Sequence, residues 1–178
     1  MPRIIVSLTS FPQRINTVWL TIETLLRQTI KPDYIILWLS KEQFSTKKSL
    51  PKNLLSLERR GLSIRFVEGD LKSHKKYYYS FKEYPNDFII TVDDDTFYNT
   101  KLIEYLWRAH LQFPQCICCN HSRILSYNNK QELLPYSLWE HNYRYNYLPS
   151  KQLCAIGVGG ILYPLILYPQ LWKIKSYL

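Results

Sequence analysis

Three consecutive aspartates, Asp93, Asp94 and Asp95, are the residues of this sequence whose type and spacing most plainly suggest chemistry. They follow the apolar run 88–92, and capping a following helix would need only one of them. Neighbouring carboxylates repel each other, so three together require a compensating charge. A divalent cation such as Mg²⁺ or Mn²⁺ resolves the repulsion, because hard cations take oxygen ligands from carboxylates and complete their shell with phosphate oxygens and water.

In an extended strand Asp93 and Asp95 point to the same side, while Asp94 points elsewhere. We therefore predict that Asp93 and Asp95 are ligands of one divalent cation. The competing interpretation is a solvated acidic turn that caps the helix after it.

A glycine group, Gly157, Gly159 and Gly160, lies near the end of the chain. It does not form the dinucleotide fingerprint GxGxxG after a first strand, and the phosphate loop GxxxxGK[ST] is absent from the sequence. Glycines permit close approach of the backbone to a ligand or to another segment. A bulge in an extended segment is an equally good interpretation.

The cysteines, Cys116, Cys118, Cys119 and Cys154, lack the paired spacing of a zinc site, and a strand would point Cys118 and Cys119 to opposite faces. No basic segment with a following apolar run precedes the first strand-like run, so we expect no secretory signal, a cytoplasmic location and reduced thiols. Buried, inert cysteines are the favoured interpretation, and zinc binding is the weaker alternative.

Positive charge is concentrated in the middle of the chain. The formal net charge is +9, and residues 41–82 carry eleven Lys and Arg against four Asp and Glu. Nucleic acid, an anionic membrane surface and a nucleotide diphosphate all suit such a field, although a solvated basic face explains any single lysine equally well. The apolar stretch 161–171 is interrupted by Pro164 and Pro169 and is too short for a transmembrane helix.

The elements that must position these residues alternate along the chain up to residue 113. Short apolar or β-branched runs predict strands at residues 3–8, 34–39, 63–67 and 88–92. Apolar spacing, or the place of a crossover, predicts helices at residues 15–26, 50–58, 75–81 and 102–113, the last capped by Asn99. Beyond Pro114, residues 116–119 and 161–167 look extended and residues 135–147 look irregular.

This alternation predicts one α/β domain over residues 1–178, with a mostly parallel sheet and helices on both faces. The length of 178 residues suits a single domain, and 46% hydrophobic residues are enough to build its core. Ligands of such sheets bind at the carboxyl ends of the strands, which is where the three aspartates lie.

Three segments resemble those of one family: SLTSFPQRI at residues 7–15, FIITVDDD at 88–95 and GVGGILYP at 157–164. Together they are similar to bacterial glycosyltransferases of the GT-A fold, the family-2-like nucleotide-sugar transferases, over nearly the whole chain. An Asp-x-Asp motif alone is weak, but an apolar fourth strand ending in TVDDD, with the other two segments at suitable distances, is fairly specific. The resemblance implies the GT-A (nucleotide-diphospho-sugar transferase) fold and a donor such as a UDP-sugar.

The resemblance also implies roles for individual residues. Mn²⁺ or Mg²⁺ bridges the donor diphosphate and is held chiefly by Asp95, with Asp93 reaching the ribose or a metal-bound water and Asp94 contacting the sugar. The metal stabilises the charge that develops on the leaving nucleoside diphosphate. Further donor contacts are expected from the loop after the first strand, the end of the third strand, a lysine pair and the glycine group: Thr9, Ser10, Phe11, Arg14, Asp70, Lys75, Lys76, Gly159 and Gly160. In the ordinary alternative Thr9 and Ser10 only turn the chain, and Asp70 only caps.

The family pattern continues with a further acidic motif, which supplies the base that deprotonates the acceptor hydroxyl in inverting members. This sequence ends at Leu178 without one, so we expect a C-terminally short domain whose catalytic residue is unknown. Glu140, His141 and His121 are candidate substitutes only because general bases are usually such residues. A catalytically inactive nucleotide-binding remnant is therefore an open alternative.

The predicted function is transfer of a sugar from a nucleotide-sugar to a hydroxyl acceptor, of hexosyltransferase and inverting type, during synthesis of a capsule, another surface polysaccharide or a lipid-linked glycan. The basic middle segment, together with Trp172, Lys173 and Lys175, would allow peripheral contact with an anionic inner membrane face.

Two other functions fit less well. Aspartate-dependent phosphotransfer is disfavoured because such enzymes usually carry Asp-x-Asp on the first strand. A nucleic-acid binder would explain the charge, but it leaves the three carboxylates unexplained, since they would repel the phosphate backbone.

Overall fold

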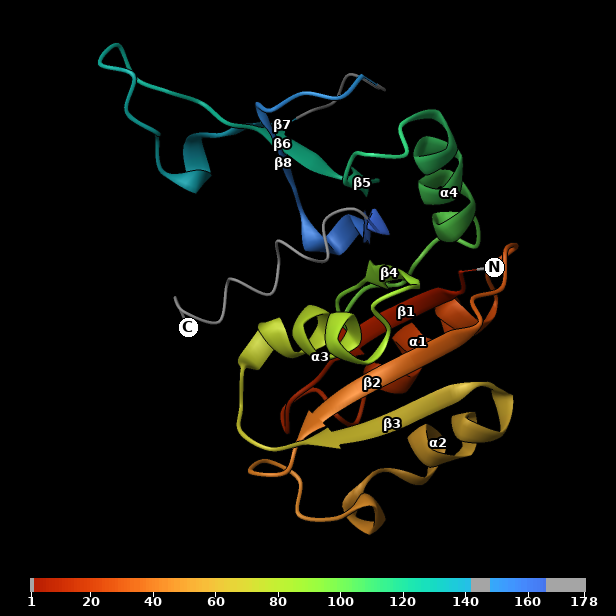
Figure 1. The fold of residues 1–178 in the computed structure, drawn as a ribbon. Coiled ribbons are helices and arrows are strands. Elements are labelled where there is room, and N and C mark those ends of the chain that lie inside the picture. The colour runs from red at the N-terminus through yellow and green to blue at the C-terminus, as the bar shows by residue number, and fades with distance from the viewer. Residues whose placement is uncertain (1, 142–147, 166–178) are drawn as a thin grey trace.

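The fold is built on a six-stranded sheet, seen in the computed structural model of the chain, which describes residues 2–141 and 148–165. The strand order is β3-β2-β1-β4-β9-β5, in which β1 to β4 are parallel and β9 is antiparallel to both of its neighbours (Figure 1). The strands are β1 (Ile4–Thr9), β2 (Tyr34–Ser40), β3 (Leu62–Val67), β4 (Phe88–Thr91), β5 (Cys118–Cys119) and β9 (Ile161–Tyr163). The prediction of a mostly parallel sheet is confirmed.

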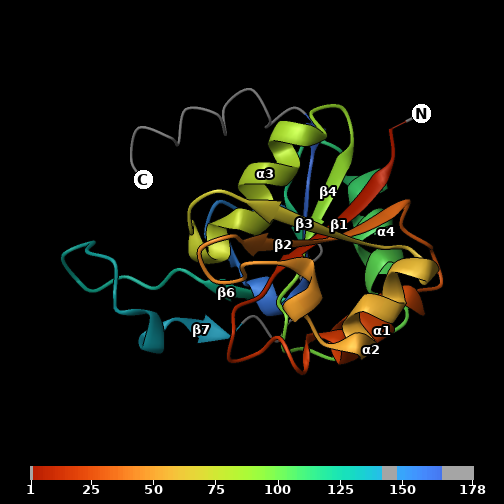
Figure 2. The ribbon, with the colours of Figure 1, turned by 90° about the horizontal axis from the view of Figure 1, so that it is seen from below.

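Helices cover both faces of this sheet, as predicted. Helices α1, α2 and α4 lie on one face and α3 lies on the other (Figure 2). Their bounds are α1 (Val18–Leu26), α2 (Lys52–Ser56), α3 (Lys75–Glu83) and α4 (Leu102–Gln112). The helix predicted at residues 75–81 from the place of a crossover between two parallel strands is confirmed as α3.

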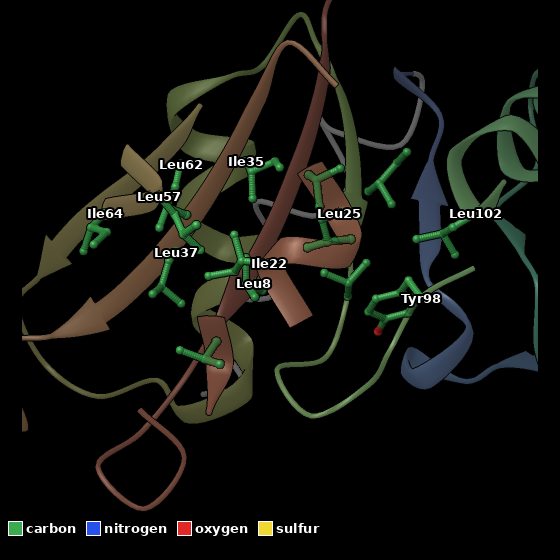
Figure 3. Packing of buried hydrophobic residues seen from close by; sticks show 14 of the residues in the cluster. Leu8, Ile22, Leu25, Ile35, Leu37, Leu57, Leu62, Ile64, Tyr98 and Leu102 are labelled. Carbon is green, nitrogen blue, oxygen red and sulfur yellow. The ribbon is translucent and has the colours of Figure 1, made fainter. Parts of the chain in front are cut away.

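Strand side chains alternate between two cores, because successive residues of a strand point to opposite faces. Val6 and Leu8 of β1 belong to the core under α1, α2 and α4, whereas Ile5 belongs to the core under α3. Figure 3 shows how Ile22 and Leu25 of α1 pack against the larger of these cores. Each of these five side chains is fully buried, so the sheet and its helices form a rigid base for the loops at its edge.

Two helix boundaries differ from the prediction because local turns replace helical ones. Helix α1 begins at Val18 rather than at Ile15, since the carbonyl of Phe11 accepts hydrogen bonds from two following N–H groups and closes a separate turn. The helix predicted at 50–58 is α2 followed by a 3-10 turn, η2 (Leu57–Arg60).

A small antiparallel sheet lies beside the main one, in the order β7-β6-β8. Its strands are β6 (Ser122–Ile124), β7 (Glu140–His141) and β8 (Leu153–Ala155). The prediction that residues 135–147 are irregular is wrong for residues 136–141, which form the 3-10 turn η4 (Tyr136–Leu138) and β7. Strands this short carry no recognisable alternation. Residues 142–147, and the part of the predicted strand 161–167 beyond 165, lie outside the described residues.

Candidate functional site

Two loops that follow neighbouring parallel strands come together at one edge of the sheet. β1 ends at Thr9 and continues into the loop from Ser10 to Arg14, while β4 ends at Thr91 shortly before Asp93. β1 and β4 are paired in parallel, so both loops leave the sheet at the same carboxyl edge. This edge collects most of the residues that the sequence marked for chemistry.

Asp94 is the buried member of the acidic group. Its Oδ2 accepts a hydrogen bond from Ser10 Oγ (2.6 Å), and its Oδ1 accepts one from Arg14 Nη1 (2.9 Å). The same Arg14 nitrogen lies 2.8 Å from Oδ2 of Asp95, whose side chain is 47% exposed. The guanidinium carbon also lies 5.3 Å from the centre of the exposed Phe11 ring, a cation–π contact. Arg14 therefore joins the two loops.

The expectation that Asp94 points away from the side shared by Asp93 and Asp95 is wrong. β4 ends at Thr91 and the chain bends at Asp94 and Asp95, so strand alternation no longer applies there. The carboxylates of Asp94 and Asp95 both reach Arg14, whereas Asp93 bonds elsewhere. Because both oxygens of Asp94 are bonded inside the chain, the geometry favours a positioning role for this residue.

Asp93 faces the other side of the edge, toward the start of α3. Lys76 Nζ lies 2.5 Å from its Oδ1, and the Asp93 N–H donates to the hydroxyl oxygen of Tyr98 (2.8 Å). Burial raises the pKa of Tyr98 to about 12, so this hydroxyl stays protonated. A Cβ on Gly157 would lie 3.1 Å from Asp93 Oδ1, so the absence of a side chain there leaves space beside the carboxylate.

Two side chains of helix α1, Thr21 and Thr24, and Gln28 just after the helix anchor the acidic loop, and the sequence alone did not single them out. Thr21 and Gln28 are almost fully buried. They bond the loop at three points: Thr21 Oγ1 donates to Asp94 O (3.0 Å), Thr24 Oγ1 accepts from Tyr98 N (3.1 Å) and Gln28 Nε2 donates to Asn99 O (2.8 Å). Gln28 Oε1 also accepts from the N–H of Ile103 in α4 (3.1 Å). Their spacing of three and four residues was the available signal, because it is the spacing of neighbours on one helical face.

Asp70 and Lys75 form a second acid–base group, after β3. Lys75 is 2% exposed and its Nζ bonds Asp70 Oδ1, which also accepts from the N–H of Lys72 (2.9 Å). Gln43 Nε2 donates to Asp70 Oδ2 (2.7 Å), a partner that the sequence gave no reason to suspect. Burial alone would raise the pKa of Asp70, but the hydrogen bonds from Lys75 and Lys72 outweigh it and lower the pKa. Lys75 is thus bonded to Asp70, and of the two lysines only Lys76 bonds one of the three aspartates, Asp93. The donor contact predicted for both lysines stays a prediction.

A buried hydroxyl network fixes α3 against the sheet and so places Lys76. Trp38 Nε1 donates to Ser80 Oγ (2.8 Å), Ser80 donates to Ser7 Oγ (2.7 Å), and Ser7 donates to the carbonyl of Lys76. Thr9 Oγ1 donates to the Trp38 carbonyl (2.8 Å) and is likewise used inside the protein.

The glycine group forms a 3-10 turn, η5 (Gly157–Gly159), rather than a bulge in an extended segment. Gly157 lies beside Asp93, and a Cβ on Gly159 would lie 2.5 Å from the backbone nitrogen of His121. Gly160 has a φ of 74°, in the left-handed region that favours glycine. The turn lies beside Asp93 at its start and beside His121 at its end, and the close approach to a donor sugar stays a prediction.

Two candidate bases lie close together: His121, just before β6, and His141 of β7. Their ring centres are 6.4 Å apart in an edge-to-face arrangement. Glu140, the third candidate, is an exposed residue of β7. Through η5 the histidine pair is connected to the acidic edge, but the role of a base remains a prediction for each of the three.

The cysteines are free thiols in the described part of the chain. Cys118 is buried, and burial raises its pKa to about 11, which agrees with the prediction of an inert thiol. Cys116, Cys119 and Cys154 are half-buried. Within residues 2–141 and 148–165, no three His, Cys, Asp or Glu side chains are grouped as ligands of a metal, so nothing there supports the zinc alternative.

The acidic edge nevertheless has the chemistry of a site for a hard divalent cation shared with a phosphate ligand. Asp93 and Asp95 present carboxylates that are 33% and 47% exposed, and Gly157 leaves space beside the first of them. Mg²⁺ and similar ions commonly take one or two carboxylates and obtain their remaining ligands from phosphates and water. The carboxylates present thus have the chemistry for such a cation, while Asp93 is bonded to Lys76 and Asp95 to Arg14 in this structure.

Comparisons with known proteins found similarity at the level of structure. No protein-family model and no curated protein matches the sequence. The 4-diphosphocytidyl-2C-methyl-D-erythritol synthase of Anaerococcus prevotii matches 98% of this chain and 76% of its own, with a TM-score of 0.60 and 15% identity. S. aureus TarS 1–349, in complex with UDP, matches 95% of this chain and 48% of its own, with a TM-score of 0.55 and 13% identity. The mannosyltransferase PcManGT of Pyrobaculum calidifontis, in complex with GDP-Man and Mn²⁺, matches 96% of this chain and 46% of its own, with a TM-score of 0.54 and 11% identity.

These similarities confirm the predicted fold class. The chain has the mixed α/β fold of nucleotide-diphospho-sugar transferases, which similar solved structures share at 11–15% identity. It spans about half the length of the TarS and mannosyltransferase chains.

Proposed function

We propose that this chain binds a nucleotide-sugar at the carboxyl edge of its sheet and transfers the sugar to a hydroxyl group. The observation that carries the proposal is the convergence of the loop after β1, the three aspartates after β4 and the start of α3 at that edge. Sheets of this kind bind ligands at the carboxyl ends of their strands. Structures with the same fold hold UDP in TarS and GDP-Man with Mn²⁺ in the Pyrobaculum mannosyltransferase.

In this proposal Asp95 and Asp93 hold Mn²⁺ or Mg²⁺ together with the donor diphosphate. When bound, the cation acts as a Lewis acid for the charge that develops on the leaving nucleoside diphosphate. Arg14 and Lys76, already beside the carboxylates, supply further positive charge to the phosphates. Asp94 holds the β1 loop in place through Ser10 and Arg14.

The base and ribose of the donor would lie along the loop after β1 and the end of β3. Phe11 has an exposed ring that could stack on a base. The hydroxyls of Thr9 and Ser10 and the carboxylate of Asp70 have partners inside the chain, so these residues would contribute mainly main-chain groups unless those bonds exchange. Gly159 and Gly160 would lie under the donor sugar.

The acceptor is proposed to be a glycan or a lipid-linked glycan of a surface polysaccharide, with inverting transfer. His121 beside η5, its neighbour His141, and Glu140 of β7 are the proposed acceptors of the proton of its hydroxyl. No helix among the described residues has the length and apolar character needed to cross a membrane. Peripheral contact with an anionic membrane stays a proposal, and Trp172, Lys173 and Lys175 lie outside the described residues.

Nucleotidyl transfer to a sugar phosphate is a second candidate, favoured by one specific observation. The synthase of Anaerococcus prevotii is covered over 76% of its length, whereas the TarS and mannosyltransferase chains are covered over about half. The loop after β1, TSFPQR, contains no glycine to cradle a triphosphate through its backbone, which favours the glycosyltransferase. Release of pyrophosphate from CTP or UTP with a sugar phosphate would identify the second activity.

The proposal is tested by calorimetric titration of UDP and GDP with and without Mn²⁺, on the wild-type protein and on Asp95→Ala. Glu83→Ala, at the other end of α3, removes the same charge away from the site. We expect metal-dependent binding that Asp95→Ala weakens at least about tenfold and Glu83→Ala leaves unchanged. Hydrolysis of a panel of UDP-sugars then tests turnover. Absence of nucleotide binding under every metal condition would reject the proposal.

A further inference from the structure

The carboxylates proposed to hold a divalent cation already have two cationic partners in the chain itself. Arg14 Nη1 lies 2.9 Å from Asp94 Oδ1 and 2.8 Å from Asp95 Oδ2, and Lys76 Nζ lies 2.5 Å from Asp93 Oδ1. The Arg14–Asp94 and Lys76–Asp93 contacts are charge-assisted hydrogen bonds, which are stronger than those between neutral groups, and the Arg14–Asp95 contact is an ion pair. A cation that binds Asp95 and Asp93 must therefore replace bonds that the folded chain has already formed.

The charges of this cluster, Asp93 to Asp95 with Arg14 and Lys76, disfavour a bare divalent cation. Three carboxylates and two cationic side chains leave a single net negative charge. A divalent cation alone would turn this into a net positive charge and would compete with Arg14 for Asp95. The phosphates of a nucleotide arriving with the cation restore negative charge and offer the displaced guanidinium a bidentate partner.

Arg14, rather than Lys76, is the partner free to exchange. Its side chain is 42% exposed and extends from a loop, whereas the Lys76 side chain is 13% exposed and its backbone is held by the buried Ser7 network. Asp94 is buried and also bonded to Ser10, so Arg14 can release Asp95 while it remains on Asp94. The Phe11 ring beside the guanidinium keeps it near the edge after release.

We infer that Arg14 is an internal counter-ion that occupies Asp95 in the nucleotide-free protein and yields it only to a cation accompanied by a nucleoside diphosphate. This inference rests on the proposed function and deepens it: the ligand of the site is the metal–nucleotide complex, bound as a unit. By linkage, a nucleotide that raises the affinity for the cation is itself bound more tightly by the same factor when the cation is present. Arg14 is a positioning residue that sets the size of this factor.

The experiment measures Mn²⁺ binding alone and with saturating UDP, by electron paramagnetic resonance of free Mn²⁺, and the reciprocal UDP binding by calorimetry. Arg14→Gln removes the charge but keeps a donor for buried Asp94. We expect its affinity for bare Mn²⁺ to rise about tenfold and the enhancement by UDP to fall about as much. Arg14→Lys keeps the positive charge on a shorter side chain, so its affinity for bare Mn²⁺ should lie between those of the wild type and Arg14→Gln. Thermal melts establish that each variant is folded.

Arg60→Ala is the matched control, because Arg60 forms a bidentate pair with Glu23 on the exposed side of α1 and its loss removes the same charge from the protein. Arg60→Ala should change neither the affinity for Mn²⁺ alone nor the affinity for Mn²⁺ in the presence of UDP. Equal affinity of the wild type for bare Mn²⁺ and for Mn²⁺ with UDP, or unchanged bare Mn²⁺ affinity in a folded Arg14 variant, would overturn the inference. If no nucleotide binds, the proposed function fails, while the titration with Mn²⁺ alone still decides whether Arg14 competes with the cation.

Discussion

Two adjacent lysines at the start of α3 serve two aspartate groups in different ways. Lys75 is 2% exposed and bonds Asp70, whose side chain is 17% exposed. Lys76, the next residue, is 13% exposed and bonds Asp93, whose side chain is 33% exposed. Successive residues of a helix point about 100° apart, so one residue step directs the two ammonium groups to the ends of different strands.

The difference separates a buried structural ion pair from one whose carboxylate a ligand can reach. Asp70 receives bonds from Lys75, Lys72 and Gln43, so its carboxylate is committed inside the protein. Asp93 keeps a solvent-facing part, and Gly157 leaves space beside it. A ligand can therefore reach the exposed part of Asp93 while Lys76 stays in place, whereas at Asp70 it would have to displace several internal donors.

Replacing each lysine in turn should give the largest difference between the Lys75–Asp70 and Lys76–Asp93 pairs. Lys75→Met should lower the free energy of unfolding by about 3 kcal/mol, because it leaves a largely buried carboxylate without its counter-charge. Lys76→Met should cost less than about 1 kcal/mol, since Asp93 is partly solvated, and should instead weaken metal-dependent UDP binding. Urea denaturation measures the first effect and calorimetry the second.

Lys82→Met is the control for the lysine pair, because Lys82 is an exposed residue of the same helix. Its stability should match that of the wild type. Equal destabilisation by Lys75→Met and Lys76→Met would show that the two pairs are alike after all.

The loss of stability at acidic pH should also distinguish the Lys75–Asp70 pair from the Lys76–Asp93 pair, with a smaller effect. The pKa of Asp70 is lowered in the folded protein, although burial alone would raise it, so its contribution is present above the ordinary aspartate value of 3.8 and is lost as the pH falls through the folded value. Asp70→Asn should therefore be less stable than the wild type at pH 7, and the gap should shrink below pH 3.8. Urea melts from pH 7 to pH 3 measure it, and a gap that stays constant would argue against a charged pair.

Tyr98→Phe should have the smallest effect, because the ring stays in the core and only the hydroxyl is lost. The N–H of Asp93 would lose its acceptor, at a cost of about 1 kcal/mol in unfolding free energy. The looser carboxylate should weaken UDP binding in the presence of Mn²⁺ severalfold. Tyr105→Phe, on the exposed side of α4, is the control and should change neither quantity. A Tyr98→Phe protein with unaltered stability and binding would remove this hydroxyl from the site.

Much of the fold was predictable because its signals are local. Apolar runs mark β1 to β4, and helical spacing marks α1 and α4, so the alternating order of elements follows from neighbouring residues alone. The small sheet was not predictable, since its strands contain two or three residues and pair only through contacts distant in sequence. The spacing of Thr21, Thr24 and Gln28 is visible in the sequence, but the backbone groups that they bond are not.

The sequence by itself determined the α/β class and the three aspartates at the end of an apolar strand, because burial pattern and charge are properties of a local segment. Only the tertiary structure decided which cation each carboxylate meets: Lys75 at Asp70, Lys76 at Asp93, and Arg14 between Asp94 and Asp95. The physical reason is that a charge pair forms between side chains that the packing of the whole sheet brings within hydrogen-bond distance, and residues 80 positions apart in sequence, such as Arg14 and Asp94, carry no local record of that meeting.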